Sequence, residues 1–179
     1  MPSDADLIQR FANGQEDAFD ALYRRHVRLV YGIAFRMTHS AEDARDLCQE
    51  TFLQVYRGLV DLREPAAFVG WLRQITVRLC LGHLRRRDAQ QRASDVAPAA
   101  DVRPWPDRVA EARDAEAHMR ALLDALPAED RAVVVLRDVE RLSYDEIADA
   151  MGWTLGKMKT RLHRARATLA RQYRQLEGN

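Results

Sequence analysis

The sequence predicts an all-α fold of two helical domains joined by a flexible linker, the second domain containing a helix-turn-helix. Apolar residues recur at spacings of three and four along most of the chain, as on the buried stripe of a helix. No segment shows sustained strand alternation, although residues 133–136 are β-branched enough to suggest a strand locally. Residues 88–106 lack periodicity and hold three of the six prolines. We therefore expect domains at 1–87 and 107–179 around this linker.

Residues 4–38 predict two helices. Asp4 or Asp6 can cap the start of the first, and Asn13-Gly14 ends it. The second helix is indicated by apolar residues at helical spacing, namely Ala18, Phe19, Leu22, Tyr23, Leu29, Val30, Ile33 and Ala34. These apolar faces require a packing partner elsewhere in the fold.

A third helix is expected from Ser40 to about Leu59. Glu42 and Asp43 fall in its first turn, where carboxylates interact favourably with the positive end of the helix dipole. Its apolar face consists of Ala44, Cys48, Thr51, Val55 and Leu59. The remaining surface mixes acidic and apolar side chains and is typical of a protein-docking face; it carries Asp46, Gln49, Glu50 and Leu53.

A fourth helical pattern follows a loop that contains Pro65 and ends in three consecutive arginines, Arg85 to Arg87. Its apolar positions are Phe68, Leu72, Ile75, Leu79 and Leu84. Helical spacing returns after Pro106 and runs to Leu126, where Pro127 breaks it. A further segment then leads to residue 140.

The stretch from Leu142 to Leu169 predicts two helices around a tight turn. Ser143 and Glu146 have the spacing of a capping box, Gly152 supplies a left-handed helix end, and Thr154 can cap the next helix. The second helix has one apolar stripe, formed by Leu155, Met158, Leu162, Ala165 and Leu169.

The other surface of this last helix is entirely basic. No Asp or Glu occurs from Ala150 to Leu176, whereas solvated helix faces usually mix charges of both signs. Opposite the stripe lie Lys157, Thr160, Arg164 and Arg171, and beside it lie Lys159, Arg161 and Arg166. This pattern predicts helix-turn-helix binding to duplex DNA. We expect Lys157 and Arg161 to read bases and Arg171 to contact phosphate.

The distribution of charge agrees with this interpretation. The formal net charge is only +1, but residues 141–179 carry eight basic and four acidic side chains, against seven and twelve in residues 88–140. A local basic surface on a neutral chain indicates a nucleic-acid site and argues against general polyanion binding.

Two cysteines, Cys48 and Cys80, are too few for a disulfide framework, so we expect reduced, buried thiols and a cytoplasmic protein. The N-terminal sequence has no apolar run of signal length, and no stretch approaches the ~20 apolar residues of a membrane span. The sequence therefore predicts neither export nor membrane insertion.

Three motifs resemble segments of one family. Residues 46–50 read D-L-C-Q-E and precede Thr51-Phe52, residues 71–75 read W-L-R-Q-I, and residues 142–166 match LSYxEIAxxxGxxxGxxKxRLxRAR. In this order, with a proline-bearing linker between the second and third, they resemble the sigma-70 family of bacterial transcription initiation factors. The resemblance is to the small two-domain extracytoplasmic-function (ECF) group.

The resemblance implies binding to RNA polymerase core, to promoter DNA and to an anti-sigma factor. Core polymerase contacts would come from Asp46, Leu47, Gln49, Glu50, Phe52 and Leu53. Contacts to the melted −10 element would come from Trp71, Arg73, Gln74, Arg78, Arg85, Arg86 and Arg87. Contacts to the −35 duplex would come from Thr154, Lys157, Lys159, Thr160, Arg161, Arg164, Arg166 and Arg171. Family members often have Asn and Asp where this chain has Arg78 and Gly82, which implies a different −10 preference.

Other readings have less support. A helix-turn-helix repressor or activator with an N-terminal sensing or dimerisation domain would explain the helices, but not the motifs at 46–50 and 71–75. No catalytic constellation suggests an enzyme. Cys80 and His83 have a metal-like spacing but lack a second ligand pair, and His26, His39 and His118 have no further potential metal ligand in company with them. We therefore expect no metal or cofactor. Trp71 suits core packing and base contact equally.

Overall fold

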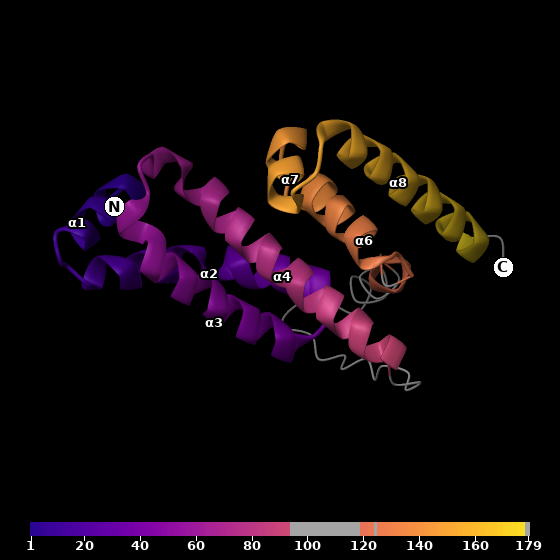
Figure 1. The fold of residues 1–179 in the computed structure, drawn as a ribbon, viewed down its shortest axis with the longest axis horizontal. Helices are drawn as coiled ribbons and strands as arrows, with labels where there is room; N and C mark the ends of the chain where they lie inside the picture. The colour runs from indigo at the N-terminus through magenta and orange to yellow at the C-terminus, as the bar shows by residue number, and fades with distance from the viewer. Residues whose placement is uncertain (94–118, 124, 178–179) are drawn as a thin grey trace.

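The computed structural model describes residues 1–93, 119–123 and 125–177, and these residues form helices, turns and loops without a strand (Figure 1). The prediction of an all-α fold is confirmed. Most of the 88–106 linker lies outside the described residues, as does His118.

Helix α1 (Asp4–Ala12) begins with a capping box at Ser3, so the predicted cap, Asp4 or Asp6, is wrong. Ser3 is the N-cap: its hydroxyl accepts from the Asp6 N–H at 3.1 Å, and the Asp6 carboxylate accepts from the Ser3 N–H at 2.8 Å. Asp6 takes the place that Glu or Gln usually has in this motif, which is why the box was missed. The helix ends at Asn13, and Gly14 adopts φ +85°, as expected for a break.

Helices α2 (Asp17–Thr38), α3 (Ala41–Gly58) and α4 (Phe68–Ala93) pack together and with α1 (Figure 1). Ser40 caps α3 as predicted, its hydroxyl accepting from Asp43 N–H at 3.1 Å. Two short 3₁₀ turns, η1 (Leu59–Asp61) and η2 (Pro65–Ala67), connect α3 to α4. The core here includes fully buried Leu22, Leu59 and Phe68.

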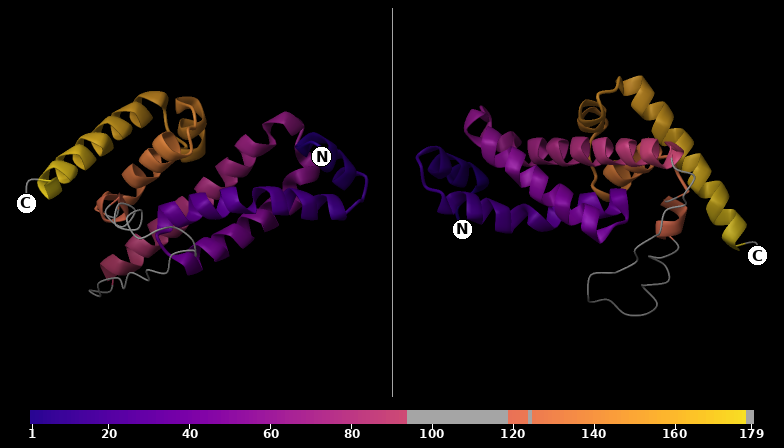
Figure 2. Two further views of the ribbon diagram at one scale, coloured as in Figure 1. Left: turned by 180° about the vertical axis from the view of Figure 1, so that it is seen from behind. Right: turned by 60° about the horizontal axis from the view of Figure 1, so that its bottom comes forward.

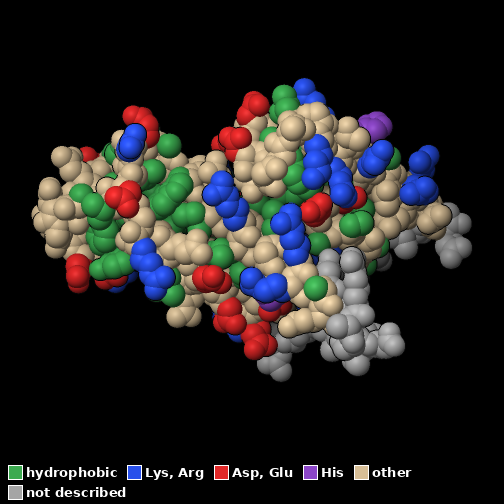
Figure 3. Space-filling model, in the orientation of Figure 1, with side chains coloured by type: hydrophobic (Ala, Val, Ile, Leu, Met, Phe, Trp, Pro, Cys, Tyr) green, Lys and Arg blue, Asp and Glu red, His purple; other side chains and the backbone are tan. Residues whose placement is uncertain are grey.

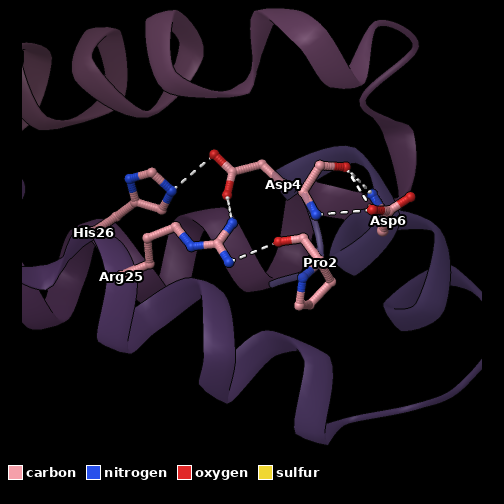
Figure 4. Close-up of polar contacts among 6 residues, drawn as sticks. Pro2, Asp4, Asp6, Arg25 and His26 are labelled. Carbon is pink, nitrogen blue, oxygen red and sulfur yellow. Dashed lines mark hydrogen bonds and ion pairs between the residues drawn. The ribbon is translucent and has the colours of Figure 1, made fainter.

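An ion-pair cluster fastens the N-terminus to α2 (Figure 4). The Asp4 carboxylate lies 2.6 Å from Arg25 Nη1 and 2.9 Å from His26 Nε2, and Arg25 also donates to the Pro2 carbonyl at 2.8 Å. His26 thus has a carboxylate partner from the preceding helix, which its neighbours in sequence do not indicate.

Helix α4 continues to Ala93, six residues past the predicted end at Arg87. The segment after the arginines has no Pro or Gly before Pro98, and its Ala, Gln and Arg residues favour helix. The helix therefore continues past Arg87 although apolar residues no longer recur at helical spacing. The domain boundaries given above remain predictions.

After a helical segment at 119–123, the chain forms α6 (Ala128–Val134), the π-helical turn η3 (Val135–Val139), α7 (Tyr144–Met151) and α8 (Leu155–Glu177). The β-branched residues 133–135 are helical and almost fully buried. Burial against neighbouring helices decided their conformation, because β propensity is weak beside packing.

The C-terminal helices lie against α4 (Figure 2) and share a hydrophobic core with α2, α3 and α4. Helix α4 packs against α6 and α7, and α2 contacts α6 and η3. Buried residues from both parts meet, including Met37, Leu81, Leu84, Leu136 and Ile147. Polar contacts reinforce this interface, because buried Arg131 donates to the Met37 carbonyl at 3.2 Å and Arg36 pairs with Glu140.

Both cysteines are free and buried, as predicted. Burial raises the pKa of Cys48 to about 11 and that of Cys80 to about 12. Thiols with such pKa values are mostly protonated near neutral pH and therefore poor nucleophiles.

Candidate nucleic-acid interface and docking groove

The predicted helix-turn-helix is formed by α7, a short turn and α8. Ser143 and Glu146 form the expected capping box at 3.2 and 2.7 Å, and Gly152 ends α7 with φ +66°. The Thr154 hydroxyl accepts from the Lys157 N–H at 3.3 Å and caps α8. Hydrogen bonds from the Ser143 backbone N–H and, to a smaller extent, from the Ser143 hydroxyl lower the pKa of Glu146.

The apolar stripe of α8 faces the core in its middle section. Met158, Leu162 and Ala165 are buried, Leu169 is half-buried, and Leu155 at the first turn is exposed. On the outer surface the exposed predicted −35 residues are Thr154, Lys157, Lys159, Thr160, Arg164, Arg166 and Arg171. Lys and Arg side chains accordingly gather along the surface that α8 occupies (Figure 3).

Arg161 differs from the other predicted −35 residues. Its guanidinium lies 2.7 Å from Asp130 Oδ1 and 3.2 Å from Glu129 Oε2, and its side chain is only 34% exposed. Arg166, which remains more exposed, pairs with Asp138 through Nε at 3.1 Å. The acids come from α6 and η3, so the absence of acids within α8 did not reveal these pairs.

Two aromatic rings, neither of them among the predicted site residues, also hold α8 cations. Lys157 Nζ lies 4.4 Å from the centroid of the Trp153 ring, and Arg161 Cζ lies 5.6 Å from it. Tyr144 has Arg137 Cζ at 4.6 Å and Lys159 Nζ at 5.8 Å. Spacings of four between Trp153, Lys157 and Arg161 could have indicated the first contact.

The predicted −10 side chains lie along α4 in mixed surroundings. Arg78, Arg85 and Arg86 are exposed, whereas Trp71, Arg73, Gln74 and Arg87 are half-buried. The Trp71 ring packs over Gly58 at the end of α3, where an added Cβ would lie 3.1 Å from the ring. The structure therefore shows the packing role of Trp71, which leaves part of the ring exposed.

Several of these α4 arginines contact other parts of the protein. Arg85 Nη2 lies 3.0 Å from Glu129 Oε1, and Arg87 donates to the Thr38 carbonyl at 3.3 Å. Arg73 is close enough to Glu146 to lower its pKa slightly. A cleft between α4 and α7 is lined by Arg78, Leu81, Gly82, Arg85, Asp149, Ala150, Met151 and Gly152. Glu129 pairs with Arg161 of α8 as well as with Arg85 of α4, so one carboxylate binds a predicted DNA-contacting arginine from each part of the chain.

The predicted docking face of α3 is divided between surface and core. Asp46, Gln49, Glu50 and Leu53 are exposed, the Leu53 side chain to 50%. Leu47 and Phe52, which the family resemblance included, are buried. Both therefore support the face from beneath in this structure.

An aromatic groove runs beside this face, between α2 and α3. It is lined by Phe19, Tyr23, Val27, Tyr31, Arg45, Cys48, Gln49, Phe52, Leu53 and Tyr56. Its rings pack edge to face, with centroids 4.7 Å apart for Tyr23 and Phe52 and 5.0 Å apart for Phe19 and Tyr56. Helical spacing predicts Phe19 and Tyr23 on the apolar face of the second helix. In the structure, α3 covers that face only partly, so Tyr23 and Tyr56 stay exposed beside the groove.

Models of two protein domains match the chain. Sigma-70 region 2 matches residues 22–90, and Sigma-70 region 4 matches residues 118–169. The chain belongs to the sigma-70 family. Within this family it falls in the ECF group: it is 41% identical over 169 residues to the ECF RNA polymerase sigma factor SigM of Mycobacterium tuberculosis, an alignment that covers 94% of this chain and 84% of SigM.

Two further sigma-70 relatives extend the comparison. The ECF RNA polymerase sigma factor SigE of Mycolicibacterium smegmatis is 41% identical over 157 residues, which cover 85% of this chain but only 60% of SigE. RNA polymerase sigma-H factor of Pseudomonas aeruginosa is 31% identical, with 93% of this chain and 91% of that protein covered.

Solved structures agree with this sigma-70 fold. CnrH in complex with the cytosolic domain of CnrY is 26% identical, has a TM-score of 0.66 and covers 95% of this chain and 96% of that one. The sigma factor RpoE in complex with the anti-sigma factor NepR from Bartonella quintana has a TM-score of 0.71 at 21% identity, covering 87% of this chain and 96% of that one. The second likeness shows the fold alone.

The metal-like pair of this sigma-70 chain is accounted for by other contacts. Cys80 is buried in the shared core, and His83 Nε2 faces Asp43 Oδ2 at 3.3 Å. Within the described residues, no three His, Cys, Asp or Glu side chains lie together as a metal site would require. None of the helices described has the length and apolar character to cross a membrane.

Proposed function

We propose that this chain is an ECF sigma factor that binds RNA polymerase core, recognises −10 and −35 promoter elements and directs transcription initiation. The observation that carries the proposal is the presence of three different surfaces on one chain. These are the acidic and apolar face of α3, the aromatic and basic face of α4, and the basic outer face of α8. The protein acts in the cytoplasm as a binding factor without catalytic activity of its own.

Core polymerase docks on α3 and the groove beside it. Exposed Asp46, Glu50 and Leu53 offer charge and apolar area next to exposed Tyr23 and Tyr56. Aromatic side chains at a groove are typical anchors of protein interfaces. Buried Leu47 and Phe52 hold the helix in position and contribute indirectly.

Promoter DNA is contacted by α4 and α8. Arg78, Arg85 and Arg86 neutralise phosphates of the separated −10 strand, and the partly exposed Trp71 ring, near the start of the same helix, offers a surface on which a base can stack. The outer residues of α8 enter the major groove of the −35 element. Arg85 has to exchange Glu129 for phosphate, so contact with both elements involves loosening the interface between α4 and the C-terminal helices.

An anti-sigma factor is the third partner that we propose. The related structure of CnrH is a complex with the cytosolic domain of CnrY, and the apolar groove of this chain offers a surface that such a partner can cover. If the protein drives transcription fully when purified from uninduced cells and no partner accompanies it, this part of the proposal is wrong.

Titration of core polymerase tests the main proposal. We expect charge reversal at Asp46 or Glu50 to weaken core binding at least tenfold while the free energy of unfolding changes by less than about 0.5 kcal/mol, because both side chains are exposed. Asp61→Arg, a charge reversal outside α3, is the matched control. Unchanged affinity of both α3 variants would contradict the docking assignment.

DNA footprinting with and without core separates this function from that of a helix-turn-helix repressor. A repressor protects its operator alone, whereas we expect protection of both promoter elements only when core is present. Sequencing the transcripts that the holoenzyme starts would then define the two elements.

A further inference from the structure

Trp153 lies in the turn between α7 and α8, where a backbone hydrogen bond and the packing of its side chain both fix its position. Its backbone N–H donates to the Ala148 carbonyl at 2.8 Å, a bond across the left-handed Gly152. Its side chain is half-buried against the core shared by the two parts of the protein. The indole therefore has a fixed position immediately before the predicted recognition helix.

The same indole contacts two cations of α8. Lys157 and Arg161 are spaced by four and so lie along one line of α8, and Trp153 in the turn just before the helix lies within reach of both. Arg161 is also bound by Asp130 and Glu129. Lys157 is exposed, and among the described residues its ammonium has no carboxylate partner, so the indole at 4.4 Å is what orients it.

We propose that Trp153 is a positioning residue that holds the Lys157 ammonium in place to contact a base edge of the −35 element. The inference rests on the proposed function, in which α8 reads that element. A lysine has a flexible four-carbon stem, and its rotamer freedom is lost when it binds. Ordering the side chain beforehand reduces that loss, so a rigid aromatic neighbour increases both affinity and base discrimination.

Tyr144 provides an internal comparison. Its ring also contacts cations, Arg137 and Lys159, but Lys157 is not among them. An effect of Trp153 that is transmitted through Lys157 must depend on Lys157, whereas an effect of Tyr144 must not. The two aromatics therefore separate a specific contact from a general loss of packing around α8.

The test is a double-mutant cycle in the reconstituted holoenzyme. The probe is the promoter duplex that the wild-type holoenzyme selects from a library randomised at the −35 element, together with its single-base variants. Trp153→Leu retains apolar volume against the core but lacks a ring, and Trp153→Phe retains a ring. Each is combined with Lys157→Ala, and Tyr144→Leu is the matched control.

We expect Trp153→Leu to weaken promoter binding roughly two- to fivefold. The loss should centre on the base pair at which Lys157→Ala relaxes preference, and it should disappear in the Lys157→Ala background. Trp153→Phe should recover part of the affinity, and the effect of Tyr144→Leu should persist in both backgrounds.

An equal loss in both backgrounds, or an equal loss for every −35 variant, would overturn the assignment of Trp153. If Trp153→Leu fails to show a cooperative thermal transition, the cycle is run with Trp153→Phe, and additivity there overturns the assignment equally. A wild-type holoenzyme that selects no −35 sequence would instead refute the proposed function, and with it the role of Trp153.

Discussion

Helices α4 and α8 both carry a basic face, but their surroundings differ. The face of α4 is partly covered, because α6 and α7 pack along it and Arg85 pairs with Glu129. The outer face of α8 is open, and its neutralised cations, Arg161 and Arg166, lie beside the apolar stripe. Both helices carry positive charge, so charge alone does not tell which arginines and lysines can reach DNA. The packing of neighbouring helices decides it, because it covers some of these side chains and supplies carboxylate partners to others.

The largest expected effect is a loss of stability when the packing between α4 and the C-terminal helices is weakened. Leu81 of α4 is buried in the core that these helices share. Leu81→Ala should lower the free energy of unfolding by about 2–5 kcal/mol, since it leaves a cavity in the shared core. Urea denaturation measures this, with exposed Leu53→Ala as control. Equal stability of the two variants would show that the interface contributes little.

A smaller loss of stability should distinguish Arg161, which lies beside the apolar stripe of α8, from Arg164 on the outer face of that helix. Arg161→Ala leaves Asp130 without its partner and Glu129 with Arg85 alone, and we expect a loss of about 1–2 kcal/mol in stability, given the partial burial of both carboxylates. Arg164→Ala, on the exposed face, should stay within about 0.5 kcal/mol.

The same Arg161→Ala variant also tests the prediction that Arg161 reads bases. Holoenzyme binding is measured across single-base variants of the −35 element. If the substitution lowers affinity equally for every variant, Arg161 is no base reader, and its contacts with the two carboxylates account for its effect.

The capping box of α7 should have an effect of intermediate size. Ser143→Ala should cost about 1 kcal/mol of stability, because it removes a side-chain cap at the start of the helix that packs on α4. The variant is compared with wild type by thermal unfolding at neutral pH. An unchanged unfolding temperature would show that the cap does not stabilise α7 in its packed position.

The carboxylate of the same box predicts a dependence on pH. The pKa of Glu146 is below its ordinary value because Ser143 N–H donates to the carboxylate. Its stabilisation is therefore present above the ordinary pKa and is lost as the pH falls through the lowered folded-state pKa. Glu146→Gln should be less stable than wild type at pH 7, and the difference should vanish in acid. A constant difference at all pH values would contradict this account.

The smallest expected effect lies at the far end of α8. Arg171→Ala should weaken holoenzyme binding alike for all −35 sequences and should lower the slope of log affinity against log salt by about one, since a phosphate contact releases one counterion. Lys157→Ala is the comparison, because we expect it to relax preference at one base pair. If the effect of Arg171→Ala depended on the −35 sequence, the prediction that Arg171 contacts only phosphate would be wrong.

The sequence by itself determined most of the helices, most of their caps and the family. Ser40, Ser143, Gly152 and Thr154 act at the helix ends where their local chemistry placed them, because capping involves groups only a few residues apart. The same reasoning failed at Ser3, where an Asp replaced the usual box partner, and at Arg87, where good helix formers extended α4 beyond its apolar pattern.

Tertiary structure decided which predicted site residues are free. The partners of Arg161, Arg85 and His26 lie 31, 44 and 22 residues away in sequence, respectively, at Asp130, Glu129 and Asp4. No periodicity within one helix contains such information. The groove between α2 and α3 and the burial of Leu47 and Phe52 have the same origin, because the packing of neighbouring helices sets which side of an amphipathic surface remains exposed.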